Sequence, residues 1–427
     1  ISQAIDRKRR TPSFNFAVLF LDFDRFKIIN DSLGHEAGDL LLVEIARRMQ
    51  ESLRGTDSIC HASAESLAAR LGGDEFVVLI EDVRGPSDAM NVAERLLARL
   101  GEPFKLSGYN LITTASIGVT TTELEYQNAD DMIRDADTAM YHAKAAGKAR
   151  CVLFDRAMHE EVSARLALET ELRAAIDRQD FFLEYQPIIS LQNRRLRGFE
   201  ALIRWKHENS GTIPPGRFIA CAEETGMIVP IGAWALREAC RQLKQWKSTV
   251  PEASDLIVSV NVSARELMLS EFAANVESIV RESELSPDSL VLEITETMMI
   301  TDPDGCIEVL GQLRKLGIHV YMDDFGTGCS SLAILHRMPI DGLKIDRSFI
   351  RNVAERRDYA AVVQAIVALA HNLNISLIAE GIELPEQISL LQSMDCEYAQ
   401  GFVFSPPLSA RNAEKFMTTG GQMSAAA

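Results

Sequence analysis

The stretch Val320-Tyr-Met-Asp-Asp-Phe-Gly-Thr-Gly328 combines an apolar run with two adjacent carboxylates. The residues from Gly317 to Met322 predict a buried strand, and a loop with two glycines follows Asp323 and Asp324. Neighbouring carboxylates at a strand end repel each other unless positive charge neutralises them, and divalent cations bound through oxygen do this well. The alternative interpretation is a helix N-cap followed by a turn, so the rest of the C-terminal half is needed to choose between the two.

Length and charge restrict the classes of protein to consider. The chain has 427 residues, 47% of them hydrophobic, which predicts two or three domains. Its net charge of −17 argues against nucleic acid as a partner, because phosphate backbones are bound by basic surfaces. No apolar run has the length of a membrane span, so we expect no membrane contact. The start at Ile1, without a signal peptide, suggests a cytoplasmic piece of a longer protein, such as a membrane-anchored sensor.

Cysteine and histidine usage bears on the kind of metal site. The seven cysteines show no Cys-x-x-Cys spacing, which is typical of reduced thiols in a cytosolic protein. The eight histidines also lack the spacing of metal ligands. Any metal is therefore expected to be bound through oxygen.

The C-terminal part alternates predicted strands with predicted helices. Eight strands in this rhythm are typical of an α/β barrel, the TIM-like (β/α)8 fold. The predicted strands are Phe182–Ile189, Leu196–Arg204, Leu256–Val262, Leu290–Thr295, Ile318–Met322, Gly342–Ile345, Ser376–Ala379 and Tyr398–Phe404. We assign this domain to residues 181–418 and expect residues 419–427 to form a flexible tail.

The N-terminal part predicts strand, helix, hairpin, helix and strand in turn. This is the β-α-β-β-α-β pattern of a ferredoxin-like α/β sandwich, with additions. The predicted elements are Asn15–Phe23, Asp39–Leu53, Leu67–Leu71, Phe76–Ile80, Ala89–Leu100, Leu111–Thr121, Ala129–Ala146 and Cys151–Phe154. We expect this domain to span residues 1–155 and the charged segment 156–180 to be a connector helix. The fold class of the whole chain is thus α/β together with α+β.

Polar residues stand at the end of nearly every strand of the predicted barrel. They are Gln186, Glu200, Asn261, Glu293, Glu296, Asp323, Asp324, Lys344, Glu380, Glu383 and Gln400. In an α/β barrel the carboxyl ends of the strands meet in one mouth, where active sites form. The oxygen ligands suit two Mg²⁺ or Mn²⁺ ions, which can activate a water for attack on a phosphodiester. Capping of strand ends would explain any one of these residues, but not the series.

Eight short segments carry most of these residues. They are Tyr185-Gln-Pro-Ile, Glu200-Ala-Leu-Ile-Arg-Trp, Asn261-Val-Ser-Ala-Arg, Leu292-Glu-Ile-Thr-Glu, Asp323-Asp-Phe-Gly-Thr-Gly, Leu343-Lys-Ile-Asp, Ala379-Glu-Gly-Ile-Glu and Gln400-Gly-Phe. Over Phe181 to Leu408 the chain resembles the EAL-domain cyclic-di-GMP phosphodiesterases. The resemblance implies a TIM-like barrel that linearises cyclic di-GMP to pGpG with Mg²⁺ or Mn²⁺.

The resemblance also implies roles for individual residues. The metal ligands would be Glu200, Asn261, Glu293, Asp323, Asp324 and Glu380. Lys344 would orient the attacking water, with Asp324 or Glu380 as its base. The residues that contact the cyclic dinucleotide would be Gln186, Arg204 and Gln400.

Three positions concern the rim of this site. The resemblance implies that Glu296 anchors the loop Asp324–Ser331. Cys329 and Phe402 stand where the family usually has tyrosine. Neither is a metal position, so we expect an altered rate or altered loop dynamics and not a loss of activity.

The segment Gly72-Gly-Asp-Glu-Phe76 is the second candidate site. It puts two acids in a predicted hairpin whose glycines let the backbone approach a phosphate closely. Asp22, at the end of the first strand, can meet them across the sheet. Asp22 with Asp74 or Glu75 suits Mg²⁺ bound to a nucleoside triphosphate. The alternative is a tight surface hairpin with solvated acids.

Three further segments favour the metal site: Leu21-Asp-Phe-Asp-Arg-Phe-Lys27, Asn30-Asp-Ser-Leu-Gly-His-Glu-Ala-Gly-Asp39 and Ala139-Met-Tyr-His-Ala-Lys144. Over residues 12–155 the chain resembles the GGDEF-domain diguanylate cyclases, which condense two GTP to cyclic di-GMP across a homodimer. The implied Mg²⁺ ligands are Asp22, the Phe23 carbonyl and Asp74, assisted by Glu75. The implied GTP contacts are Asn30 and Asp39 to guanine, and Lys144 and Lys148 to phosphate.

The N-terminal part departs from that family in three ways. The chain begins after the expected Leu-Thr-Gly-Leu-x-Asn-Arg segment, so part of the fold is expected to be missing. Arg54-Gly-Thr-Asp57 resembles the family's inhibitory product site, but the inserted stretch Cys60–Leu67 separates it from the glycine hairpin. We therefore do not expect the usual product inhibition. Lys148 replaces a common arginine and gives a point charge in place of a bidentate fork.

These observations predict a bifunctional cyclic-di-GMP turnover protein that acts as a homodimer on cyclic di-GMP and GTP. Two alternatives stay open. In the first, only the phosphodiesterase is active and the N-terminal domain binds GTP as an activator. In the second, the chain is a cyclic-di-GMP receptor or scaffold without turnover.

Overall fold

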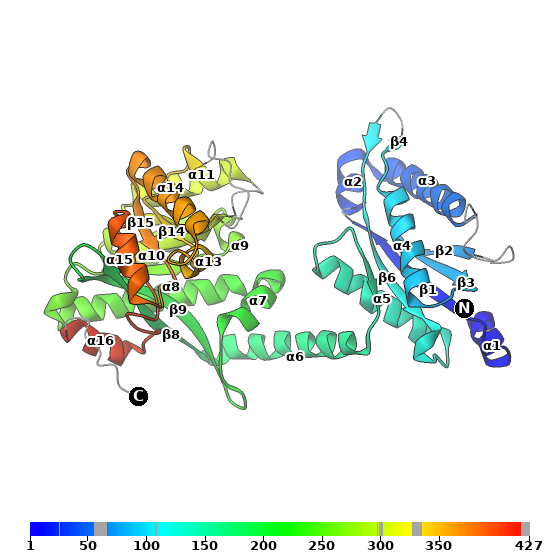
Figure 1. The fold of residues 1–427 in the computed structure, drawn as a ribbon, viewed down its shortest axis with the longest axis horizontal. Helices are drawn as coiled ribbons and strands as arrows, with labels where there is room; N and C mark the ends of the chain where they lie inside the picture. The colour runs from blue at the N-terminus through cyan, green and yellow to red at the C-terminus, as the bar shows by residue number, and fades with distance from the viewer. Residues whose placement is uncertain are drawn as a thin grey trace. The chain divides into compact units, whose positions relative to one another are not determined.

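The computed structural model describes residues 1–24, 26–54, 66–106, 109–296, 298, 302–326 and 335–419. The chain forms two compact units, Ile1–Leu166 and Ala167–Ala427, called here the N-terminal unit and the barrel unit (Figure 1). The predictions for Cys329, for Asp57 and for most of the inserted stretch lie outside the described residues. Within the described part of the chain, every helix is too short or too polar to cross a lipid bilayer.

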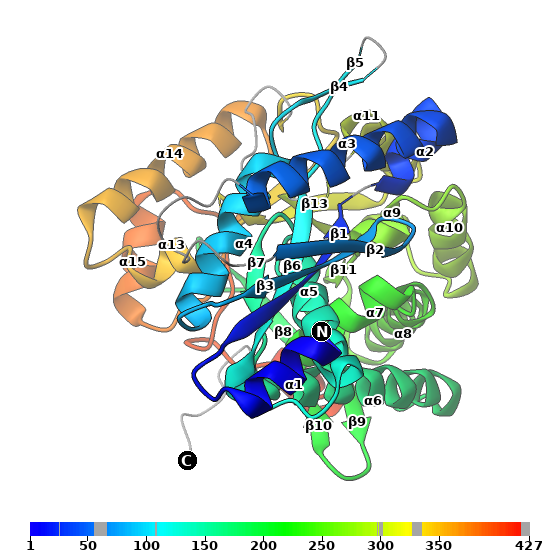
Figure 2. The same cartoon turned by 90° about the vertical axis from the view of Figure 1, so that its right-hand side faces the viewer.

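The N-terminal unit contains a five-stranded sheet in the order β2-β3-β1-β6-β7, whose strands can be followed in Figure 2. The strands are β1 (Phe16–Phe23), β2 (Ser66–Gly72), β3 (Glu75–Glu81), β6 (Ala115–Thr121) and β7 (Cys151–Leu153); β4 (Phe104–Leu106) and β5 (Tyr109–Leu111) pair separately. The helices are α1 (Ser2–Arg10), α2 (Phe26–Leu33), α3 (His35–Arg54), α4 (Pro86–Leu100) and α5 (Ala129–Ala145), with a 3₁₀ turn, η1 (Thr122–Leu124).

Strand β1 is buried on both sides, which explains why it is a continuous apolar run. Its alternate side chains separate into two cores. Leu19 and Leu21 lie in the core that includes buried residues of α3 and α4. Val18 and Phe20 lie in the core that includes buried residues of α1 and α5. The sheet is thus a central layer between two pairs of helices.

The barrel unit closes eight strands into a ring, with β10 added to β9. The strands are β8 (Phe181–Ser190), β9 (Leu196–His207), β10 (Gly211–Ile213), β11 (Ile257–Asn261), β12 (Leu290–Thr295), β13 (His319–Phe325), β14 (Gly342–Ile345), β15 (Ser376–Ala379) and β16 (Tyr398–Ala399). The helices are α6 (Arg156–Arg178), which begins in the N-terminal unit, α7 (Ile219–Thr225), α8 (Ile228–Thr249), α9 (Ala264–Leu267), α10 (Phe272–Glu282), α11 (Pro303–Lys315), α13 (Arg347–Arg351), α14 (Arg357–Leu373), α15 (Pro385–Ser393) and α16 (Ala410–Thr418). The 3₁₀ turns are η2 (Pro215–Arg217), η3 (Pro251–Ala253) and η4 (Pro287–Ser289).

The division between the units falls inside α6, between Leu166 and Ala167. Towards its start, His159 contacts Asp135 of α5 at 2.7 Å and Phe154 edge to face. Towards its end, Leu172 and Ala175 are fully buried in a core that includes Trp205 and Phe218. The predicted connector is therefore a single helix whose start contacts residues of the N-terminal unit and whose end is buried in a core of the barrel unit. The exact domain boundaries given above stay a prediction.

Three strand predictions differ from the structure. Strand β8 runs antiparallel to both of its neighbours, β9 and β16, so the barrel closes through a hairpin and not through a parallel strand. The predicted strand Leu111–Thr121 is interrupted: the side chains of Thr113 and Thr114 donate to Asp24, and β6 begins only at Ala115.

The predicted strand Tyr398–Phe404 is also wrong beyond Ala399. Gly401 explains the break, because a Cβ there would lie 2.2 Å from the carbonyl oxygen of Ile382. The chain leaves the sheet after Ala399, and a residue larger than glycine at position 401 would clash with the backbone of Ile382.

An apolar layer fills the lower part of the barrel interior. It consists of Ile188, Ile257, Val291, Tyr321 and Ile378, contributed by five different strands. This packed layer supports the polar side chains one step further along each strand.

Candidate active site

The polar side chains of the barrel mouth gather because residues alternate between the two sides of each strand. On β9, Phe199 and Ala201 lie in the core between the strands and the surrounding helices, called here the outer core. Glu200, between them, therefore faces the interior of the barrel. On β8, Tyr185 lies in the outer core, so Gln186 faces the interior. Hydrogen bonds and ion pairs join eight of the predicted site residues: Gln186, Glu200, Asn261, Glu293, Asp323, Lys344, Glu380 and Gln400.

Lys344 of β14 is the centre of this network and is 0% exposed. Its Nζ atom lies 2.6 Å from Glu380 Oε1, 2.8 Å from Glu293 Oε2, 3.2 Å from Glu200 Oε2 and 3.6 Å from Asp323 Oδ1. A buried ammonium group costs several kcal/mol unless it is paired. Burial alone would lower the pKa of Lys344, but Asp323, Glu200 and Glu293 raise it well above its ordinary value. Lys344 is therefore charged and balances part of the negative charge.

Glu200 accepts from three side chains, those of Asn261, Gln400 and Lys344. Asn261 Nδ2 donates to its Oε1 at 2.8 Å, and Gln400 Nε2 donates to its Oε2 at 2.6 Å. Burial raises the pKa of Glu200, but Lys344 and the two amides outweigh burial and lower it below its ordinary value. Gln400 also donates to Gln186 Oε1 at 2.9 Å. Glu200 is thus an ionised carboxylate in a fixed orientation.

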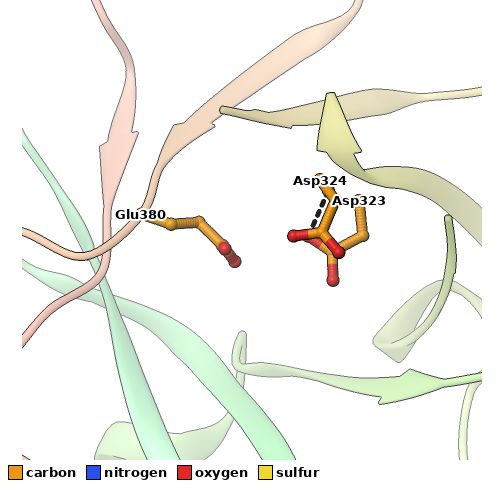
Figure 3. A group of neighbouring side chains, drawn as sticks. All are labelled: Asp323, Asp324 and Glu380. Carbon is orange, nitrogen blue, oxygen red and sulfur yellow. Dashed lines mark hydrogen bonds between the residues drawn. The ribbon is translucent and has the colours of Figure 1, made fainter. Parts of the chain in front are cut away.

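Asp323 and Asp324 would point to opposite sides of an ordinary strand. The pairing of β13 with β14 shifts register between Met322 and Phe325, and Asp324 has a φ of 55°. This left-handed conformation is uncommon outside glycine, although aspartate tolerates it better than most residues. It brings both carboxylates to the same place: oxygens of Asp323, Asp324 and Glu380 lie within 4.8 Å of one another. Figure 3 shows the Glu380 side chain pointing toward the two aspartates.

The pKa values of three of these acids are raised, because they are buried close to other carboxylates. Burial and the neighbouring charge of Asp323 raise the pKa of Asp324 to about 6. Burial raises the pKa of Glu380 to about 8, although Lys344 opposes the change. Burial and the charge of Glu200 raise the pKa of Glu293 well above its ordinary value. The site holds more negative charge than one lysine neutralises.

Divalent cations fit this arrangement. All the candidate donors are carboxylate or amide oxygens, which hard cations prefer. Glu293 Oε1 and Gln400 Oε1 are buried and have no hydrogen-bond partner among the described residues. A buried acceptor without a partner is costly, and a bound cation or its water would satisfy it. The residues present therefore suit Mg²⁺ or Mn²⁺.

Two predicted residues lie at the rim of the mouth. Glu296 is 2% exposed, and its Oε2 accepts from the backbone N–H of Gly326 at 3.1 Å. It therefore holds the start of the loop that follows Asp324, although residues 327–334 lie outside the described residues. Phe402 is 65% exposed. Glu383, a polar residue from the same series, is exposed, and its backbone N–H donates to Gln387 Oε1 at 2.9 Å.

In the N-terminal unit, the glycine hairpin and the end of β1 meet as expected. Asp22 is paired with Glu75 in the antiparallel register of β1 and β3, and Gly73 has a φ of 52° in the turn. Lys144 Nζ of α5 lies 2.7 Å from Asp22 Oδ2. Burial raises the pKa of Asp22, Lys144 lowers it and Asp74 raises it, with a net increase. These acids and one lysine form a second oxygen-rich site.

Other predicted residues of this unit lie around these acids. The Asn30 side chain packs so closely on Gly38 that a Cβ there would lie 1.9 Å from Asn30 Oδ1. Asn30 Oδ1 is buried without a hydrogen-bond partner among the described residues. Asp39 is exposed and lines a groove of about 520 Å³ between α3 and the β2–β3 hairpin. The Phe23 ring is buried against Phe76, with ring centroids 5.9 Å apart. The Lys148 side chain is exposed.

Comparison with known proteins identifies the family. The family described as "EAL domain" matches residues 169–407, more than half of the chain. The chain belongs to the EAL domain family. The family described as "Diguanylate cyclase, GGDEF domain" matches residues 1–150, so a GGDEF domain precedes the EAL domain. Both resemblances stated from the sequence are confirmed.

The EAL protein is similar to characterised proteins over most of its length. It is 41% identical over 410 residues to MucR of Pseudomonas aeruginosa, a bifunctional diguanylate cyclase and cyclic di-GMP phosphodiesterase. It is 38% identical over 401 residues to NbdA of the same organism, a cyclic di-GMP phosphodiesterase. These matches cover 96% and 94% of this chain, but only 57% and 50% of the two relatives. The chain thus spans about half the length of these relatives.

Solved structures agree with the barrel fold. The structure titled as the PaMucR phosphodiesterase in complex with c-di-GMP is 40% identical, with a TM-score of 0.56. It covers 58% of this chain, and 99% of that chain is matched. The structure of the EAL enzyme Bd1971 with cAMP and cyclic di-GMP is 29% identical, with a TM-score of 0.59, and the match covers 72% of this chain and 82% of that one. EAL domains are generally metal-dependent, in agreement with the oxygen-rich mouth.

The EAL protein also has polar residues near its sites that the sequence analysis did not single out. Glu184 of β8 forms an ion pair with Arg204 at 2.8 Å, and it could have been found as the position two before Gln186 on the same side of the strand. Asp24 accepts from Thr114 Oγ1, Ser116 Oγ and the backbone N–H of Ala149. These partners lie far apart in the sequence, so only the fold reveals them.

Proposed function

We propose that the EAL domain hydrolyses cyclic di-GMP to pGpG and that the GGDEF domain condenses two GTP to cyclic di-GMP. The observation that carries the first half is the arrangement of four carboxylates around Lys344, with two amides fixing Glu200. The relatives named above, one bifunctional and one a phosphodiesterase, support the same substrate.

The metal ligands that we propose are Glu200, Asn261, Glu293, Asp323, Asp324 and Glu380. Two Mg²⁺ or Mn²⁺ ions bound there would supply an activated water and would neutralise charge on the phosphodiester. The cyclic dinucleotide would be contacted by Gln186, Arg204 and Gln400. Glu296, which accepts from the backbone N–H of Gly326, would anchor the loop Asp324–Ser331.

Two side chains of the protein have separate roles: Glu380 accepts a proton and Lys344 supplies positive charge. Glu380, whose pKa burial raises in the metal-free site, can accept a proton from the attacking water. Lys344 Nζ lies 2.6 Å from Glu380, and it would donate to that water once bound cations take over one of its carboxylate partners. Both groups act from the interior of a barrel that the apolar layer below keeps rigid.

For the GGDEF domain we propose Mg²⁺ on Asp22, the Phe23 carbonyl and Asp74, with Glu75 assisting. Asn30 and Asp39 would bind guanine, and Lys144 and Lys148 would bind phosphate. The unpaired Asn30 Oδ1, buried beside Gly38, supports a ligand with a hydrogen-bond donor there. Since each domain would hold one GTP, synthesis would require a homodimer.

A turnover experiment tests both halves. One tube contains the protein, Mn²⁺ and cyclic di-GMP, with and without GTP; a second contains the Glu200→Ala variant with GTP alone. Production of pGpG in the first and of cyclic di-GMP in the second supports the two-way enzyme. Hydrolysis that rises with GTP, without synthesis, would instead make the GGDEF domain an activator. Binding without turnover in either tube would make the protein a receptor.

Replacement of Asp74 is expected to remove synthesis. The Asp74→Ala variant, measured in the Glu200→Ala background so that product accumulates, loses an Mg²⁺ ligand and should make cyclic di-GMP at least about 100-fold more slowly. Asp130→Ala, which removes an exposed acid of α5, is the matched control and should synthesise normally. Synthesis that survives Asp74→Ala contradicts the assigned cyclase site.

Metal binding by the EAL domain is expected to weaken as the pH falls from 8 to 6. Asp324 and Glu380, with pKa values near 6 and 8, must lose their protons to bind a cation. The affinity for Mn²⁺ without nucleotide should therefore rise by up to about tenfold for each pH unit in this window. Because both pKa values are raised in the folded state, the metal-free domain should lose stability as the pH rises through the same window.

Isothermal titration at pH 6, 7 and 8 measures the affinity, and thermal unfolding measures the stability. Glu380→Gln should flatten the pH dependence, whereas Glu414→Gln, on the exposed side of α16, should not. An affinity for Mn²⁺ that is independent of pH in the unmodified protein would exclude these two carboxylates as ligands.

A further inference from the structure

Arg204 and Glu184 form an ion pair on strands β9 and β8, separate from the hydrogen-bonded network around Lys344 and Glu200. Arg204 Nε donates to Glu184 Oε2 at 2.8 Å, and Nη1 of the same guanidinium donates to the carbonyl oxygen of Ile203 at 2.9 Å. The side chains are only 13% and 29% exposed. At this exposure the pair is less screened than an ordinary surface ion pair, so it can hold the arginine in place.

The strand pairing puts this ion pair on the mouth side of the barrel. Glu200 and Gln186 are opposite each other in the register of β8 and β9, and both face the interior. Glu184 and Arg204 lie two and four residues further along the same sides, because side chains repeat every second residue. Glu184 is opposite Leu202, so Arg204 reaches it diagonally. Both charges therefore stand above the carboxylate network, towards the open end.

The two hydrogen bonds fix the plane of the guanidinium group and leave part of it available. Glu184 Oε2 accepts from Nε–H, and the carbonyl oxygen of Ile203 accepts from Nη1–H. The Nη2 atom has no hydrogen-bond partner among the described residues. Because two of its nitrogen atoms are hydrogen-bonded, the guanidinium group already has a fixed orientation, and its Nη2–H groups can donate to a phosphate oxygen. An arginine without these bonds would first have to lose rotamer freedom.

We propose that Glu184 is a positioning residue for substrate binding: it holds Arg204 so that its available edge meets a phosphodiester of the cyclic dinucleotide. This inference rests on the proposed hydrolysis of cyclic di-GMP. Glu184 does not touch the reacting atoms, and its effect is on affinity.

The test compares Glu184→Ala, Glu184→Gln and Arg204→Ala with the unmodified protein. Loss of a charge-assisted bond that orders Arg204 should raise the KM for cyclic di-GMP by about tenfold, with kcat changed by less than about twofold. Glu184→Gln keeps an acceptor of the same length but no charge, and it should raise the KM by about threefold. In the double variant, Glu184→Ala should add nothing to Arg204→Ala, because the two residues act as one unit.

Glu238→Ala is the matched control, since it breaks an exposed ion pair with Arg241 on α8, at 2.7 Å. It should leave KM and kcat unchanged. Equilibrium binding of cyclic di-GMP without metal gives a readout that does not need turnover, and Glu184→Ala should weaken it by about tenfold. Thermal unfolding checks that each variant is folded.

The outcomes separate this inference from the proposed function. An unchanged or lowered KM in Glu184→Ala overturns the positioning role, and so does a fall in kcat with KM unchanged. Binding without hydrolysis by the unmodified protein, weakened in Glu184→Ala, supports the positioning role and overturns the proposed hydrolysis. An unmodified protein that neither binds nor hydrolyses cyclic di-GMP overturns both.

Discussion

Replacing Glu200 with glutamine is expected to reduce hydrolysis of cyclic di-GMP by at least about 100-fold, because even an outer partner of a metal ligand costs up to that factor. Glutamine keeps the shape and one acceptor oxygen, but it removes the ionised group that faces Asn261, Gln400 and Lys344. The defect should be in kcat and in metal affinity together, since the proposed role is metal binding.

Glu200→Ala should give the same loss of activity with a larger loss of stability. It leaves one N–H group of the buried Gln400 amide without its acceptor, at a cost of about 1–3 kcal/mol, whereas the exposed Asn261 amide can turn to water. Turnover assays with Mn²⁺ and thermal unfolding separate the two effects. Glu208→Ala, an exposed acid in the β9–β10 turn, is the control. Hydrolysis at the normal rate in Glu200→Gln would refute the assigned site.

Replacing Lys344 with methionine is expected to destabilise the metal-free barrel by about 3–5 kcal/mol, since it leaves buried carboxylates without their cation. For a unit of this size the melting temperature should fall by roughly 10 °C. The affected carboxylates are Glu200, Glu293, Asp323 and Glu380. Added Mn²⁺ should restore part of the stability, because it supplies the missing positive charge.

The pH dependence of this variant has a definite sign. Without Lys344 the acids in the folded state hold their protons to a higher pH than in the unfolded chain. The folded state then binds more protons, so its stability falls as the pH rises. The deficit of Lys344→Met should therefore be smaller at acidic pH than at alkaline pH. Lys315→Met, at the exposed end of α11, should show no such trend. A deficit that is equal at both pH values would mean that Lys344 contributes packing and not charge.

Sequence periodicity predicts most of the strands and helices, and it groups the polar residues at the strand ends in one mouth. The roles of these residues rest on the resemblance to the EAL and GGDEF families. Glu200 and Gln186 stand out because a polar residue within an apolar strand is costly unless it serves a site. Strand ends in a barrel converge, so residues from strands far apart in sequence can be grouped from the strand pattern alone. The amphipathic pattern of the segment 156–180 predicts one helix, and α6 confirms it as Arg156–Arg178.

The sequence pattern does not reveal the direction in which a strand runs, nor which residues of two strands lie side by side. An apolar run has the same pattern whichever way the strand runs, so it does not predict the antiparallel β8. The pairing of Glu184 with Arg204 requires the register of two strands, which a linear pattern does not contain. The convergence of Asp323 and Asp324 requires the bulge and the left-handed φ of Asp324, and both are local departures from strand geometry.

The antiparallel first strand has a consequence for biosynthesis. β8 is made early and pairs at once with β9, but its other edge must wait for β16, to which it pairs through Tyr398 and Ala399. Gln186 and its partner Gln400 are 214 residues apart, and Leu408 exchanges two backbone hydrogen bonds with Tyr185. A nascent chain that stops before these residues leaves one edge of β8 unpaired, and the active-site mouth lacks Gln400 and is open to water. Truncated products should therefore be both inactive and prone to aggregation, so that only a finished chain acquires the ligand set.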